Sequence, residues 1–171
     1  DMGSHIYNLK RFSTTGFSWY NSQLYWGQEY LTVYAPGAYI LGSAFASTAP
    51  GVQGGVMALH ILVLLSIGLA TFGTYVFVNK YSESNISAVI CAVVYSGSAF
   101  IWESLRHSIL DFLAYALIPW VLLAILVLVS SPSWRSYSAA GIAIAVQFLV
   151  SPIVSYHTVV VAVSYTHLRA H

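Results

Sequence analysis

GVMALHILVLLSIGLATFGTYVFVN, residues 55–79, is an uncharged stretch long enough to cross a membrane as a helix. A bilayer core of about 30 Å requires roughly 20 apolar residues per helix. Three further apolar stretches cover residues 86–102, 112–129 and 137–162, and they approach or meet that length. The sequence therefore predicts an all-α fold, a polytopic bundle of four transmembrane helices within residues 55–162.

Charged residues are confined to the connections between these stretches. An ionised side chain at the centre of a membrane helix costs about 2.5–3.5 kcal/mol on insertion scales. The charged residues between positions 54 and 162 are Lys80, Glu83, Glu103, Arg106, Asp111 and Arg135. The composition, 58% hydrophobic and 6% charged, is also typical of a membrane protein. We expect an integral protein surrounded by membrane lipid, in the plasma membrane of a prokaryote.

Both ends of the chain indicate a fragment of a longer, metagenomic reading frame. Residues 163–171, VSYTHLRAH, resemble one translated frame of a transposase adapter used in sequencing libraries. Residues 1–3 lack the regions of a signal peptide. Without Arg169 the formal net charge falls from +1 to 0. We therefore expect no basic surface for nucleic acid, and we expect the fragment itself to be inactive.

The segment that precedes the apolar stretches has a different composition. Residues 1–33 are rich in tryptophan, tyrosine and amide side chains. Tryptophan and tyrosine concentrate at membrane surfaces, because each joins an apolar ring to a polar group. We predict an interfacial extracytoplasmic loop here, with an aromatic soluble loop as the alternative. Residues 34–50 are apolar but bounded by Pro36 and Pro50, which predicts a short half-inserted helix rather than a thin span.

The few basic residues orient the bundle. Lysine and arginine are enriched in cytoplasmic loops, and Lys80 and Arg135 follow the first and third predicted spans. If both are cytoplasmic, residues 103–111 face outside together with the aromatic N-terminal segment. Pro119 and Pro152 fall inside apolar stretches, where we expect them to kink or break helices beside chain that satisfies the freed carbonyl groups.

Polar groups that could carry out chemistry gather on this predicted outer face. A carboxylate beside a cation can act as a general base or bind a divalent metal, and arginine with histidine can bind a phosphate. The spacing also allows a structural role, because Glu103 and Arg106 can pair along a helix and Asp111 can cap the next helix. The candidates are Asp1, His5, Glu103, Arg106, His107 and Asp111.

A resemblance to a known family adds to this pattern. The chain resembles the first extracytoplasmic loop of polytopic membrane proteins catalogued as related to 6-pyruvoyl-tetrahydropterin synthase. The matching motifs are Asp1-x-Gly-x-His5, Lys10-Arg11, Trp26-Gly27 and Tyr34-Ala-Pro36-Gly-Ala-Tyr39. Those membrane proteins are similar in layout to the GT-C glycosyltransferases, whereas nothing in this chain resembles the metal site of the soluble synthase.

The resemblance implies a transferase site on the extracytoplasmic face. Asp1 would be the first-loop acid, a base or metal ligand, and Asp111, or less directly Glu103, would be the second-loop acid. The reaction would transfer a sugar from a polyprenyl-phosphate-linked donor, with a divalent cation at Asp1 and Asp111 as the candidate cofactor. The substrate-binding residues that the resemblance implies are His5, Arg106 and His107.

The chain also departs from that layout. The first span is missing, and the second outer loop contains no Asp-x-Asp or Asp-x-Glu. The alternative is a transporter or another non-enzymatic polytopic membrane protein. A transporter requires polar residues near the bilayer midplane and broken helices around them, and the apolar stretches offer His60, Gln147 and His157.

Overall fold

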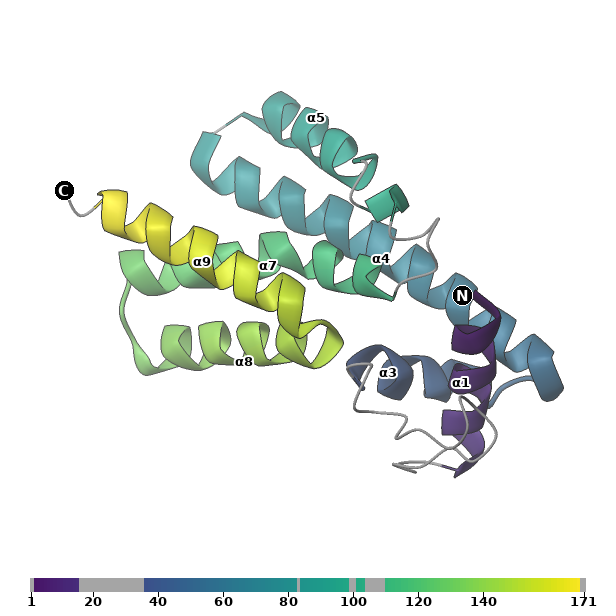
Figure 1. Cartoon of the computed structure of the whole chain (residues 1–171). Coiled ribbons are helices and arrows are strands. Elements are labelled where there is room, and N and C mark those ends of the chain that lie inside the picture. The colour runs from purple at the N-terminus through teal and green to yellow at the C-terminus, as the bar shows by residue number, and fades with distance from the viewer. Residues whose placement is uncertain (1, 16–35, 83, 99–100, 104–109, 170–171) are drawn as a thin grey trace.

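Helices packed side by side make up the computed structural model of the chain (Figure 1). The structure describes residues 2–15, 36–82, 84–98, 101–103 and 110–169. No strand occurs in this part of the chain, in agreement with the all-α prediction. The helices are α1 (Met2–Thr15), α3 (Gly37–Ala46), α4 (Gly51–Ser82), α5 (Asn85–Ser96), α7 (Asp111–Ser130), α8 (Trp134–Val150) and α9 (Pro152–Arg169).

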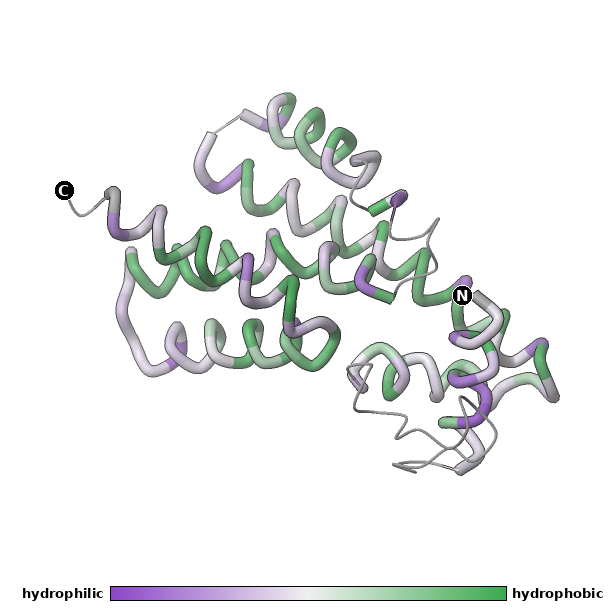
Figure 2. Tube along the Cα trace, in the orientation of Figure 1, coloured by the Kyte–Doolittle hydropathy of each residue, from purple (hydrophilic) through white to green (hydrophobic). Residues whose placement is uncertain are grey.

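Three helical segments are long and apolar enough to cross a membrane. They are Gly51–Ser82, Asn85–Glu103 and Asp111–Ser130, and they correspond to the first three predicted spans. Figure 2 shows hydrophobic residues along α4 and α7. Much of this apolar surface faces outward: Leu64 is 70% exposed and Val94 is 67% exposed. Contiguous exposed apolar surface of this kind is unfavourable in water and marks a surface that another apolar phase covers.

The fourth predicted span, residues 137–162, is not one helix. The chain forms α8 and α9 instead, with Ser151 between them. Pro152 has no backbone N–H and its ring clashes with the preceding turn, so α8 cannot continue through it. The Ser151 hydroxyl accepts a hydrogen bond from the Val154 N–H at 3.4 Å and so caps the new helix. Figure 1 shows α9 folding back along α8 and α7, which replaces the single predicted helix with a hairpin.

Pro119, by contrast, lies inside α7 without ending it. Since position 119 has no N–H, the Tyr115 carbonyl loses its partner one turn earlier. The hydroxyl of Tyr95, on α5, donates a hydrogen bond to that oxygen at 2.6 Å. A neighbouring helix therefore satisfies the carbonyl that the proline frees, as the sequence predicts.

Replacing Tyr95 with phenylalanine should lower the free energy of unfolding by about 2 kcal/mol, because a buried carbonyl is left without a donor. Pro119→Ala supplies the missing N–H within α7 and should recover most of that loss in the double variant. Chemical unfolding in detergent, followed by circular dichroism, measures the four proteins of the cycle. If Tyr95→Phe lowers the free energy of unfolding equally with proline and with alanine at position 119, the two residues do not share the Tyr115 carbonyl oxygen.

A close crossing joins α7 to α4. The Trp120 indole N–H donates to the Leu69 carbonyl at 3.0 Å, and its ring lies over Gly73. A Cβ at position 73 would overlap that indole. Glycine is therefore required at this crossing by the close approach of the ring, as small residues are at many helix contacts in membranes.

The N-terminal segment, predicted as an interfacial extracytoplasmic loop, contains a helix. Within residues 1–33, the described part forms α1, which packs against α3 and the first half of α4. The buried residues His5, Asn8, Leu9 and Phe12 recur at helical spacing. Residues 16–33, with most of the aromatic side chains, lie outside the described residues. In the 34–50 segment the chain forms α3, ten residues long and too short for a span.

Candidate functional site

One end of the bundle collects elements that are far apart in the sequence. It contains α1, α3, the first half of α4, the first turn of α7 and the turn between α8 and α9, and we call it the Asp111 end. These elements share one apolar core. Its members include Leu9, Tyr39, Leu62, Phe112 and Val154, one from each helix. The core fixes the backbone that presents the polar side chains of this end.

A buried hydrogen bond joins two polar side chains in that core. His5 is 4% exposed, and its Nδ1 lies 2.6 Å from the hydroxyl oxygen of Tyr39, which is fully buried. Burial lowers the pKa of His5 from its usual 6.5, and the Asp111 carboxylate acts in the opposite direction. His5 is therefore neutral at pH 7 and can accept a proton. The core that α1 shares with the first turn of α7 brings His5 and Asp111 to the same end of the bundle.

Asp111 lies in the first turn of α7 and is partly exposed. Leu110 occupies the N-cap position and makes no side-chain capping bond, so Asp111 is the first helical residue rather than the predicted cap. A carboxylate at this position is stabilised by the helix dipole, typically by about 0.3–1 kcal/mol. The remaining exposed surface of the side chain is accessible to a substrate.

The structure says less about the positions of the other predicted site residues. Glu103 is exposed, at the end of the short helical turn 101–103. Asp1, Arg106 and His107 lie outside the described residues, so their roles stay predictions. In the described part of the chain, no group of three or more His, Cys, Asp or Glu side chains could hold a metal ion.

Tyr39 and Asn8 were not among the predicted site residues. Asn8 follows His5 by one turn of α1, is 2% exposed, and its Oδ1 has no hydrogen-bond partner. A buried amide oxygen without a donor is costly and marks a point where a polar group could bind. The spacing of His5 and Asn8, which places both on one face of a helix, is visible in the sequence, but the prediction assigned no helix to this segment.

A second buried polar cluster lies in the α8–α9 hairpin. Gln147 is fully buried, and its Nε2 donates to the Ala114 carbonyl and to the Thr158 hydroxyl, both at 3.1 Å. It therefore links α8 to α7 and α9. Its Oε1 has no partner. The amide thus stabilises the hairpin, which accounts for a polar residue inside an apolar stretch.

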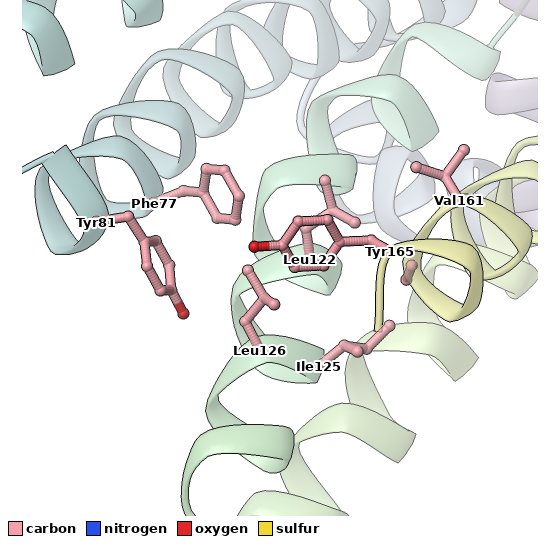
Figure 3. A pocket seen from close by; sticks show the side chains of 8 residues that line it. Phe77, Tyr81, Leu122, Ile125, Leu126, Val161 and Tyr165 are labelled. Atoms are coloured by element: carbon pink, nitrogen blue, oxygen red, sulfur yellow. The ribbon is translucent and has the colours of Figure 1, made fainter. Parts of the chain in front are cut away.

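An apolar cavity lies toward the opposite end of the bundle, with a volume of about 330 Å³. Figure 3 shows its side chains converging from α4, α7 and α9. None of them is charged, so the cavity suits hydrocarbon, and the polar side-chain groups among them are the hydroxyls of Tyr81 and Tyr165. The lining residues are Phe77, Tyr81, Leu122, Ile125, Leu126, Val161, Ala162 and Tyr165.

Comparison with protein-family models, curated proteins and solved structures finds no match to this chain. The residues of the Asp111 end and the three long apolar helices are therefore the features of this chain that bear on its function.

Proposed function

We propose that this chain belongs to a polytopic integral membrane protein whose Asp111 end is the active site of a GT-C-type glycosyltransferase. The substrate is a sugar on a polyprenyl phosphate, and the acceptor binds on the extracytoplasmic side. The observation that carries the proposal is the shared core that brings α1, with the buried His5, and the first turn of α7, with Asp111, to one end of helices long enough to cross a membrane. Acid–base chemistry at this depth suits a donor whose lipid tail stays in the bilayer.

The chemical step requires one base. The acceptor hydroxyl oxygen attacks the anomeric carbon, the bond from that carbon to the phosphate oxygen breaks, and polyprenyl phosphate leaves with the electron pair. Asp111 accepts the hydroxyl proton, which is the usual role of a positioned carboxylate. His5 is held by the Tyr39 hydroxyl, and we assign it the role of positioning that carboxylate. Asp1 and Glu103 would add negative charge for a divalent cation, and Arg106 and His107 would contact the donor phosphate.

The test uses the complete reading frame of the protein in proteoliposomes supplied with a panel of polyprenyl-phosphate-linked hexoses. We expect release of polyprenyl phosphate from at least one donor, measured by thin-layer chromatography of the lipid fraction. Folded, membrane-inserted protein that consumes no donor in the panel would contradict the proposal.

One observation favours a transporter as the second candidate. Gln147 is buried with an unpartnered Oε1 beside the break at Pro152, and transporters bind solutes at broken helices. The same proteoliposomes distinguish the two functions. A transporter would move solute into the lumen without cleaving any donor.

A further inference from the structure

A second cavity, of about 470 Å³, lies between α1 and the start of α4. Two of the six lysine and arginine residues of the chain, Lys10 and Arg11, line it. No acidic side chain is among the described residues that line it, which also include Tyr7, Thr14, Thr15, Gly51 and Val52. In a chain with so little charge, two adjacent cations at one cavity create a local positive potential that attracts anions.

The two cations have different surroundings. The Lys10 ammonium group donates to the carbonyl oxygens of Ala46 and Ala49, at 3.0 and 2.8 Å. It therefore links α1 to the connection between α3 and α4. Both acceptors are neutral carbonyl groups, so these two bonds leave the positive charge of Lys10 at the cavity. Arg11 is partly buried in the same wall. Its planar guanidinium has the shape that binds two oxygens of a phosphate at once.

The start of α4 adds N–H groups to this wall. The first N–H groups of a helix have no partner within it, and the first turn of α4 contains no acidic residue. Gly51 and Val52, at this start, line the cavity. The apolar surface of α4 begins within the next turn, so in a membrane that α4 crosses the cavity would lie at the level of the lipid headgroups.

We propose that this cavity binds the phosphate group of an anionic membrane lipid, with Arg11 as the main contact and Lys10 and the start of α4 as support. The inference rests on the membrane placement of α4 proposed above and is independent of sugar transfer. A soluble phosphate would fit the same donors, but only a lipid phosphate is delivered to this depth beside an apolar helix.

The test compares lipid binding by the full chain and two variants. Arg11→Gln removes the proposed contact, and Lys80→Gln is the matched control, because Lys80 lies exposed in the last turn of α4. Vesicles contain phosphatidylcholine alone or three parts phosphatidylcholine to one part phosphatidylglycerol. Native mass spectrometry of protein extracted from the mixed vesicles counts the bound phosphatidylglycerol. We expect Arg11→Gln to weaken phosphatidylglycerol binding about fivefold, and Lys80→Gln to leave it unchanged, with equal helicity by circular dichroism.

Three results would overturn the inference. An equal loss in both variants would show that overall charge, and not this cavity, retains the lipid. Displacement of the lipid by millimolar inorganic phosphate would assign the cavity to a soluble anion. Equal retention of both lipids by the unmodified chain would show that the cavity does not select an anionic lipid. Flotation of the protein with phosphatidylcholine vesicles measures its insertion into a membrane separately. If the protein floats with these vesicles but shows no preference for phosphatidylglycerol, the lipid-binding inference is rejected and the membrane placement of α4 is not.

Discussion

Gly55→Leu should destabilise the protein by about 3 kcal/mol. A Cβ at position 55 would overlap the carbonyl oxygen of Ile6 and lie 3.0 Å from its carbonyl carbon. Both atoms belong to the backbone of α1, so no side-chain rotation can relieve the overlap. The helix α1 must move away from α4, which exposes the buried Leu9 and breaks the contact of His5 with the core.

The matched control for this change is Gly68→Leu in the same helix. No atom lies within 4 Å of a Cβ built at position 68, which is exposed. Leucine also has a higher helix propensity than glycine, so this variant should keep or slightly raise the stability. Chemical unfolding in detergent, followed by circular dichroism, measures both variants. Equal stability of the two would mean that α1 does not pack against α4 at Gly55.

Asp111→Asn should lower the release of polyprenyl phosphate about a hundredfold, within the range for loss of a general base. Asparagine has nearly the same shape as aspartate, but its amide does not accept a proton. The free energy of unfolding should fall by less than 1 kcal/mol, since the change removes only the favourable interaction with the dipole of α7. The proteoliposome assay and chemical unfolding measure the two effects separately.

Glu103→Gln is the control for the Asp111 variant. Glu103 is exposed and precedes Asp111 in the connection that leads to α7, and its removal should reduce the rate by less than tenfold. Near-normal activity of the Asp111→Asn protein, or an equal loss in both variants, would remove Asp111 from the role of base.

The apolar helices were predictable because their signal is local. A long uncharged stretch has few alternatives to a helix, and this places the first three candidate spans within a few residues of their observed limits. At Pro152 the break in the helix was predictable, but the reversal of the chain was not. The sequence showed a helix-breaking residue, whereas the reversal of α9 depends on packing against α7 and α8. In the same way, Pro119 was visible in the sequence but its partner Tyr95 was not.

The candidate site was less predictable, because its groups meet only through tertiary packing. The nearness of His5 to Asp111 depends on how α1 and α7 sit at one end of the bundle. The aromatic content of residues 1–33 suggested a loop and concealed the amphipathic face of α1. The partner of His5, Tyr39, lies on α3 and has no local signal that separates it from the other tyrosines of the chain.

Sided cysteine labelling tests the central claim, that α7 crosses the membrane and presents the Asp111 end outside. In a Cys91→Ala background, Glu103→Cys probes the Asp111 end, and Trp134→Cys, at a position 83% exposed, probes the far end of α7. A membrane-impermeant maleimide should label Glu103→Cys in intact cells and Trp134→Cys only after permeabilisation. Labelling of both variants from the same side, or of Trp134→Cys alone from outside, would contradict the account.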